Sequence, residues 1–74
     1  MTFRSTADLI EIVTAGGGLD LEASLRPTPD LIQIAAAAAR GGGRIILRNL
    51  DLRPTGDLIQ IGSAGKGRVI FAKV

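Results

Sequence analysis

The side chains of this chain that could do chemistry are carboxylates, hydroxyls and amines. The 74 residues include no histidine and no cysteine, which excludes a histidine general base, a thiolate nucleophile and the usual zinc ligands. Asp8, Asp30 and Asp57 recur in matching contexts, and such a ladder of carboxylates could bind a cation. Each aspartate also stands where a helix should begin, and a carboxylate there favours the positive end of the helix dipole. We therefore expect neither a metal nor a cofactor.

The remaining nucleophiles do not form a catalytic pattern. Ser63 and Lys66 are three residues apart, but they fall in a predicted helix-end turn without a third group to orient them. The glycine-rich turns 41–44 and 65–68 resemble phosphate-binding loops in composition only, because they follow a helix and precede a strand. A P-loop has the opposite order and directs its amides from a helix N-terminus. We expect a protein that is not an enzyme.

Basic residues gather in the second half of the chain and could contact an anionic partner. Nine Lys and Arg against seven Asp and Glu give a net charge of only +2. The candidate contacts are Arg44, Arg48, Lys66, Arg68 and Lys73. Nucleic acid is nevertheless disfavoured as the partner, because the two aromatic residues cannot form a stacking platform for bases. A weak nucleic-acid binder stays an alternative.

The three repeated aspartates belong to a sequence motif that occurs three times. The block Phe3–Ile12 returns as Leu25–Ile34 and again as Leu52–Ile61, with Arg, Thr, Asp, Leu and Ile in the same places. Each block leads to a glycine cluster and then to a short apolar run. The three units span about residues 3–24, 25–51 and 52–74. Self-similarity of this kind predicts one domain, residues 1–74, made of three stacked helix–turn–strand units.

The pattern within a unit predicts a helix followed by a strand. Thr6, Thr28 and Thr55 are placed as helix N-caps, and apolar residues follow them at helical spacing. The glycine clusters should end the helices, and the apolar runs after them read as strands. The predicted strands cover residues 19–23, 44–48 and 68–74. We expect an α/β fold, a short βα-repeat solenoid with three parallel strands backed by three short helices.

The unit resembles the leucine-rich repeats in length and in one local motif. Thr6, Thr28 and Thr55 lie 22 and then 27 residues apart, within the range of about 20–29 residues for that family. The stretch 45–50, Ile-Ile-Leu-Arg-Asn-Leu, is similar to the family's strand followed by an asparagine. The chain thus resembles an irregular leucine-rich-repeat-like βα solenoid. The resemblance implies a curved parallel sheet that binds proteins.

Aligning the three units on their glycines predicts an interaction surface on the sheet. The alignment directs Leu21, Ile46 and Ile70 toward the helices, which leaves the neighbouring residues of the second and third strands on the outer face. One helix layer covers one side of a sheet, so the outer face would be apolar and the last strand would be an open edge. The predicted interface residues are Ile45, Leu47, Val69, Phe71 and Val74. Two alternatives stay open: the register is one residue off, or the fold wraps to make this face internal.

These features predict a non-enzymatic module for protein interaction or self-assembly, with a homo-oligomer as the expected state. A small inhibitor or adaptor that docks on a different protein is the alternative. The longest apolar run, residues 34–39, is far shorter than the about 20 residues that span a bilayer, so we expect no membrane. The N-terminus lacks a signal-peptide layout, and we expect a cytoplasmic protein. A chain that continues into a longer repeat array would also cover the open edge.

Overall fold

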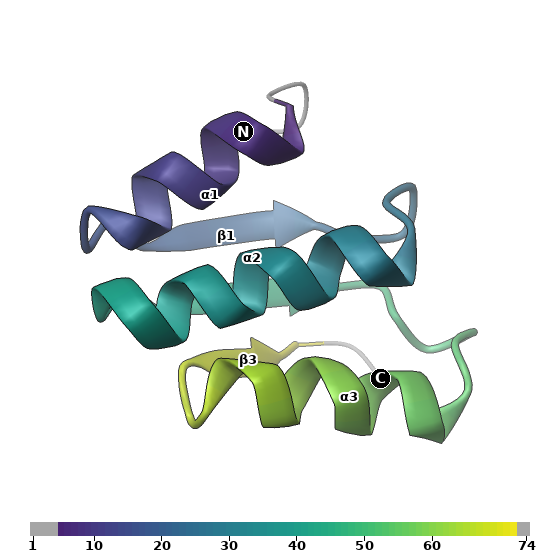
Figure 1. The fold of residues 1–74 in the computed structure, drawn as a ribbon. Coiled ribbons are helices and arrows are strands. Elements are labelled where there is room, and N and C mark those ends of the chain that lie inside the picture. The colour runs from purple at the N-terminus through teal and green to yellow at the C-terminus, as the bar shows by residue number, and fades with distance from the viewer. Residues whose placement is uncertain (1–4, 73–74) are drawn as a thin grey trace.

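Helices and strands alternate along the chain and build one parallel sheet. The computed structural model describes residues 5–72. Its elements in chain order are α1 (Thr6–Thr14), β1 (Leu19–Glu22), α2 (Thr28–Gly41), β2 (Ile45–Arg48), α3 (Thr55–Gly65) and β3 (Val69–Phe71) (Figure 1). The strands pair in parallel in the order β1-β2-β3. The predicted α/β class, with three parallel strands and three helices, is confirmed.

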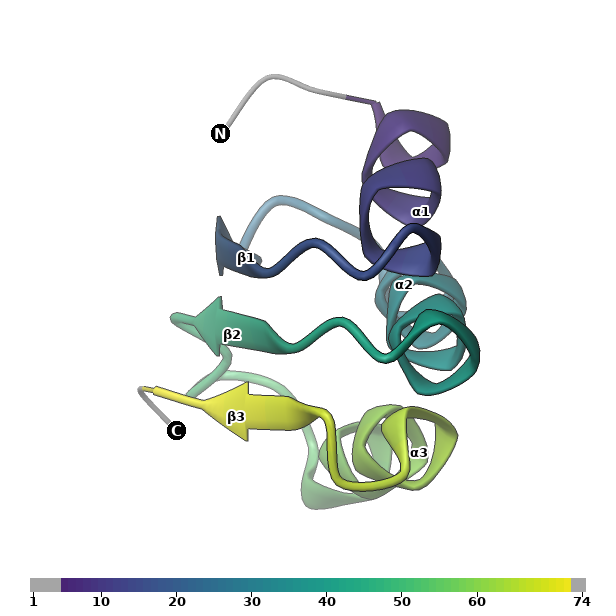
Figure 2. The same ribbon diagram turned by 90° about the vertical axis from the view of Figure 1, so that its left-hand side faces the viewer.

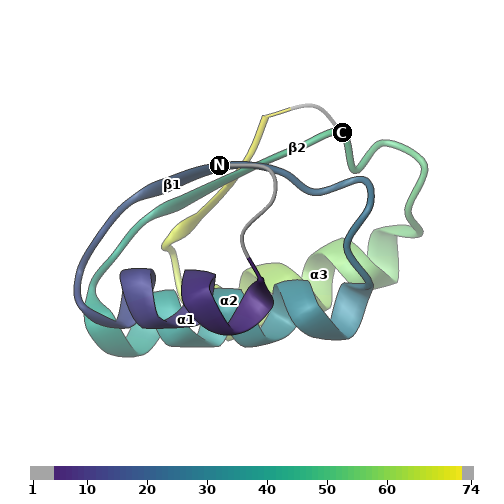
Figure 3. The same cartoon turned by 90° about the horizontal axis from the view of Figure 1, so that it is seen from above.

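The molecule has two layers. Figure 2 shows the strands on one side and all three helices on the other, with α2 between α1 and α3. Figure 3 shows the same layers from above, where β3 is turned relative to β1 and β2, as the twist of a parallel sheet requires. One face of the sheet is therefore covered by helices, and the opposite face has no covering layer among residues 5–72. None of the helices among these residues has the length and apolar content needed to cross a membrane.

The helices begin at the three repeated threonines, but these threonines are not the N-caps. The N-cap residues are Ser5, Pro27 and Pro54, one position earlier. The Ser5 hydroxyl accepts a hydrogen bond from the Asp8 amide at 3.2 Å, whereas neither proline has a side chain that can cap. The expectation of threonine caps is therefore wrong, and the threonine hydroxyls are available for contacts between units.

The glycine cluster after α2 allows two backbone segments to approach closely. A Cβ atom on Gly41 would lie 2.2 Å from the carbonyl oxygen of Thr14, and one on Gly43 would lie 2.4 Å from that of Gly17. Gly42 between them ends the helix in the left-handed conformation, with φ of 82°. This cluster therefore holds the end of α2 against the end of α1, which explains its glycines by packing.

The helix-facing side of the sheet is aliphatic, and its register differs from the predicted one. Leu19 in β1 pairs with Ile45 in β2, and Leu21 pairs with Leu47. Both residues of β2 have no solvent exposure. Their partners in β3, Val69 and Phe71, are partly buried and pack against the same core. The prediction that Ile45, Leu47, Val69 and Phe71 lie on the outer face is wrong, whereas Val74 lies outside the described residues.

The error has a simple physical cause. The strand of the first unit begins directly after Gly18, whereas in the other two units an arginine, Arg44 or Arg68, stands between the last glycine and the strand. The sheet aligns Gly18 with these arginines, because the Leu19 amide donates to the Arg44 carbonyl and the Ile45 amide donates to the Arg68 carbonyl. Aligning on the glycines shifts two strands by one residue, and a one-residue shift moves every side chain to the opposite face.

Candidate interaction surfaces

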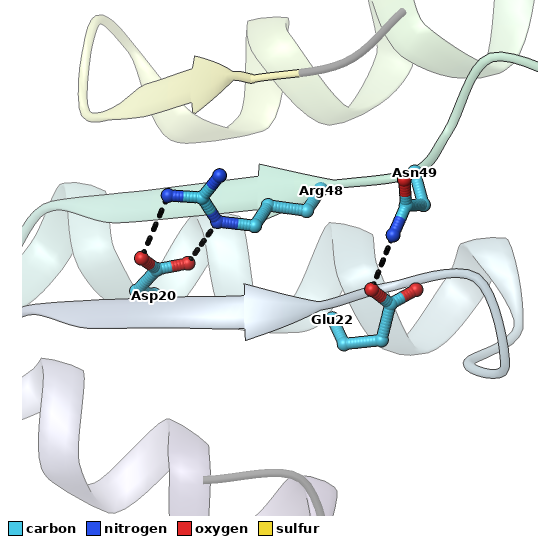
Figure 4. A network of polar contacts seen from close by, with 4 residues as sticks. All are labelled: Asp20, Glu22, Arg48 and Asn49. Atoms are coloured by element: carbon cyan, nitrogen blue, oxygen red, sulfur yellow. Dashed lines mark hydrogen bonds and ion pairs between the residues drawn. The ribbon is translucent and has the colours of Figure 1, made fainter.

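The outer face of the sheet carries a polar half over β1 and the end of β2. The Arg48 guanidinium meets the Asp20 carboxylate in a two-point contact, with Nε 2.6 Å from Oδ1 and Nη2 2.9 Å from Oδ2 (Figure 4). The side chains are 48% and 53% exposed, so solvent screens this pair. The pair links β1 to β2 on the outer face of the sheet, where it places one positive charge beside one negative charge.

A second polar contact lies at the same end of the sheet. The side-chain amide of Asn49 donates to Glu22 Oε1, as Figure 4 shows, and Ser24 Oγ donates to Glu22 Oε2 at 2.5 Å. Asn49 has a left-handed backbone with φ of 66°, a conformation that asparagine tolerates better than most residues. At this position asparagine both tolerates the left-handed backbone and supplies the side-chain amide that binds Glu22 at the end of β1.

These contacts favour the charged forms of the outer-face residues. The hydrogen bond from Arg48 lowers the pKa of Asp20 below its ordinary value of 3.8. Hydrogen bonds from Ser24 and then Asn49 lower the pKa of Glu22 below 4.5. The same Asp20 contact raises the pKa of Arg48. All three groups are therefore ionised at neutral pH.

The other half of the outer face is apolar. An open hollow of about 380 Å³ lies where the strands begin. Its lining residues are Gly18, Leu19, Asp20, Arg44, Ile46 and Ile70. Ile46 and Ile70 are register partners on β2 and β3, and Ile70 is 45% exposed at the edge of the sheet. The outward apolar residues are thus one position away from those predicted.

A third polar network joins the starts of α1 and α2. The Thr6 hydroxyl donates to Asp30 Oδ2 at 3.0 Å, and Arg26 Nη1 donates to the same hydroxyl oxygen at 3.0 Å. Thr6 belongs to the first unit, whereas Arg26 and Asp30 belong to the second. The contact therefore runs from a threonine of one unit to an arginine and an aspartate of the next.

The same arrangement recurs between α2 and α3. The Thr28 hydroxyl donates to Asp57 Oδ2 at 3.1 Å, and Arg53 Nη1 donates to the Thr28 oxygen at 2.5 Å. Arg53 Nη2 also donates to the carbonyl oxygens of Ala23, at 3.1 Å, and of Arg26. Arg53 therefore ties the start of α3 to the loop before α2. We call these two groups, Thr6–Arg26–Asp30 and Thr28–Arg53–Asp57, the junction networks.

The basic residues predicted to bind an anionic partner do not form one patch. Arg44, Lys66 and Arg68 lie where strands begin, whereas Arg48 lies at the other end of β2, about 13 Å along a strand. Arg48 is engaged by Asp20, and Arg68 Nη1 donates to the Gly42 carbonyl at 3.3 Å. Lys73 lies outside the described residues. The described members of this set are thus divided between two ends of the sheet.

Sequence reasoning missed the arginines of the junction networks. The sequence pattern assigns Arg26 and Arg53 no role beyond membership of the repeated block, although Arg, Thr and Asp recur there at constant spacing. That constant spacing of three polar residues was the available signal, because a helix start alone requires no arginine two residues before it. The repeated aspartates likewise have a second role: Asp30 and Asp57 accept hydrogen bonds from the preceding unit.

Residues 5–72 contain no group of three or more carboxylates placed to hold a metal ion. No protein-family model, no curated protein and no solved structure matches this chain. Function must therefore be inferred from the outer face of the sheet, its edges and the junction networks.

Proposed function

We propose that this chain is a non-enzymatic module that associates with protein surfaces, and foremost with copies of itself. The observation that carries the proposal is the state of β3, a strand that pairs with β2 on one side and has no strand on its other side among residues 5–72. An open strand edge presents unpaired backbone donors and acceptors to another chain. Self-association would satisfy these groups.

The apolar half of the outer face adds a hydrophobic contribution at the same edge. Ile70 on β3 is 45% exposed and adjoins Ile46 in the open hollow. Covering such a patch removes apolar area from water, which is favourable by about 25 cal/mol per Å². A partner that pairs with β3 can cover Ile70 at the same time.

The architecture that supports this function is, in our proposal, a short βα solenoid of the leucine-rich-repeat-like kind. Its support is the equivalence of the two junction networks, which repeat the same donors and acceptors at corresponding positions. Stacked units of this kind contact only their neighbours, and their sheets present one continuous surface. A cysteine-free chain suits a reducing compartment such as the cytoplasm.

Nucleic acid is the weaker alternative. Of the predicted contacts, Arg48 already binds Asp20 and Arg68 donates to a backbone carbonyl. A partner bound through phosphates would have to compete with these interactions, and the outer face also carries Asp20 and Glu22.

The test is the mass of the protein in solution as a function of concentration. Light scattering should show a mass that rises above the monomer in the micromolar range, and Ile70→Lys should reduce it by placing a charge on the open edge. Leu25→Lys is the matched control, since Leu25 is 87% exposed on the loop before α2 and away from the sheet face. A mass equal to that of the monomer at every concentration would contradict self-assembly and favour the inhibitor or adaptor alternative.

A further inference from the structure

The junction networks have a direction. At both internal junctions, the threonine at the start of one helix donates to the aspartate at the start of the following helix. The threonine therefore marks the side of a helix that faces the next unit, and the aspartate marks the side that faces the previous one. α2 carries both, since Asp30 faces α1 and Thr28 faces α3.

The outer helices each carry one unused half of this pair. Thr55 begins α3 and Asp8 lies in the first turn of α1, and both residues are exposed. Among residues 5–72, neither the Thr55 hydroxyl nor the Asp8 carboxylate has a hydrogen-bond partner. One end of the molecule thus offers the donor and the opposite end offers the acceptor of the same interaction.

The burial of apolar side chains shows the same direction. On the side of each helix that faces the next unit, the apolar residue is partly buried where a neighbouring helix is present and exposed where none is. Ile10, Ile32 and Ile59 lie four residues after the repeated threonines and so on the same side of each helix. Ile10 and Ile32 are partly buried and pack against the core. Their helices, α1 and α2, are each followed by a neighbouring helix, α2 and α3 (Figure 1). Ile59 occupies the same position on α3, which has no helix on its other side among residues 5–72, and it is 62% exposed.

The side that faces the previous unit shows the complementary pattern. Ile34 and Ile61, four residues after Asp30 and Asp57, are fully buried. Ile12, four residues after Asp8, is only partly buried. The first helix therefore has an apolar position that a preceding helix would cover, and the third helix has an apolar side chain that could contribute to covering it.

The sheet edges match these helix surfaces. Among residues 5–72, β1 has no strand on its edge next to α1 and β3 has none on its edge next to α3, and all three strands run in the same direction. A second copy that places its β1 beside β3 would extend the parallel order and would bring its α1 beside α3. A two-fold axis that pairs β3 with β3 in antiparallel order would instead place Thr55 of one copy near the C-terminal end of the other copy's α3, away from any Asp8 carboxylate.

We propose that copies of this chain associate head to tail, with α3 and β3 of one copy against α1 and β1 of the next. In this contact, the Thr55 hydroxyl donates to the Asp8 carboxylate of the second copy and the second copy covers Ile59. The inference rests on the proposed self-association and specifies its geometry. Such a contact is heterologous, so it generates a closed ring or an open filament and not only a dimer.

The test is a charge exchange across the contact. Asp8→Lys removes the acceptor, and Thr55→Asp places two carboxylates opposite each other, so each change should weaken association roughly tenfold or more. The double variant pairs Asp at position 55 with Lys at position 8 and should restore association. Because α2 separates α1 from α3 within one chain, the restoring pair must form between copies (Figure 2).

A second measurement does not depend on how strongly these variants associate. The chain has no cysteine, so Thr55→Cys and Asp8→Cys variants can be mixed under oxidising conditions without competing thiols. We expect the disulfide to join one variant to the other, and each variant alone to stay uncrosslinked. Circular dichroism of every variant, with Leu25→Lys as a control, establishes that the fold is retained.

The outcomes separate the two proposals. If the unaltered protein is monomeric at all concentrations, both self-association and the head-to-tail contact are wrong. If it self-associates but Asp8→Lys and Thr55→Asp have no effect, or if Thr55→Cys crosslinks mainly with itself, only the head-to-tail contact is wrong. Restoration by the double variant together with the mixed disulfide supports the contact.

Discussion

The two sides of the sheet differ in how far their residues repeat from unit to unit. On the helix side, corresponding positions of the three units repeat, from the aliphatic rows of β1 and β2 to the two junction networks. On the outer side no two strands are alike: β1 carries acids, β2 carries Ile46 and Arg48, and β3 carries Ile70. The repeated side holds the units together, whereas the varied side gives the molecule one polar and one apolar region for contact with other molecules.

The largest expected change in the free energy of unfolding comes from substituting two adjacent residues of β2 that face opposite sides of the sheet. Leu47→Lys places a charge at a position with no solvent exposure, which should destabilise the fold by about 4 kcal/mol or more and unfold much of a domain of this size. Ile46→Lys places the same side chain on the outer face, where the effect should stay within about 1 kcal/mol. Urea unfolding followed by circular dichroism measures both.

Equal destabilisation by the two lysines would contradict the assignment of the faces. It would mean that Ile46 is covered as fully as Leu47, for example by a partner or by a different register. Repeating the measurement at low protein concentration separates these cases, because only a partner-covered surface depends on concentration.

A smaller loss of stability is expected from replacing Arg53, which belongs to a junction network, and a still smaller one from replacing Arg48 on the outer face. Arg53→Met removes the guanidinium donors to the Thr28 oxygen and the Arg26 carbonyl and one of the two donors to the Ala23 carbonyl, so it should cost about 2 kcal/mol. Arg48→Met removes an exposed pair with Asp20 and should shift the unfolding midpoint much less. Methionine preserves most of the aliphatic stem in both variants, so packing losses are similar. A larger shift for Arg48→Met would reverse the expected importance of the two sides.

The smallest effect concerns acid pH and the outer face alone. Asp20 and Glu22 have pKa values below the ordinary 3.8 and 4.5, so the stability that their contacts contribute is present above those ordinary values and is lost as the pH falls through the folded-state values. Asp20→Asn should therefore reduce the fall in stability between about pH 5 and pH 2. Thermal unfolding across this range measures the difference.

Arg48→Met provides the companion experiment for the acid range. It removes the group that lowers the pKa of Asp20, so it should reduce the same pH dependence while keeping the carboxylate. If the pH dependence is unchanged in both variants, the contact between Asp20 and Arg48 does not persist in solution.

Much of the fold could be predicted from local patterns. Helices begin at Thr6, Thr28 and Thr55 because apolar residues follow them at helical spacing, and glycines such as Gly42 end them. The apolar runs after the glycines form strands whose bounds lie within one residue of the expected ones, except that β3 ends at Phe71 and its expected end, residue 74, lies outside the described residues. These features depend on neighbours in sequence, which is why residue types and spacing predict them.

The faces of the strands could not be predicted in the same way. Ile45, Ile46 and Leu47 are all apolar, so alternation does not reveal which of them faces the helices. Pairing of Leu19 with Ile45 decides the question, and that pairing depends on Arg44 occupying the place of Gly18. The predicted interface consequently contains the helix-facing residues Ile45, Leu47, Val69 and Phe71 in place of their outward neighbours Ile46 and Ile70.

By itself, the sequence determined that this protein is built from three similar units with an aliphatic core and without the side chains of a histidine- or cysteine-dependent site. Only the tertiary structure decided which residues face outward and which polar groups meet between units. Thr6 and Asp30 are 24 residues apart, and their contact exists because the sheet sets two helices side by side. Long-range pairing fixes such contacts, since the free energy of a hydrogen bond depends on geometry that no local segment contains.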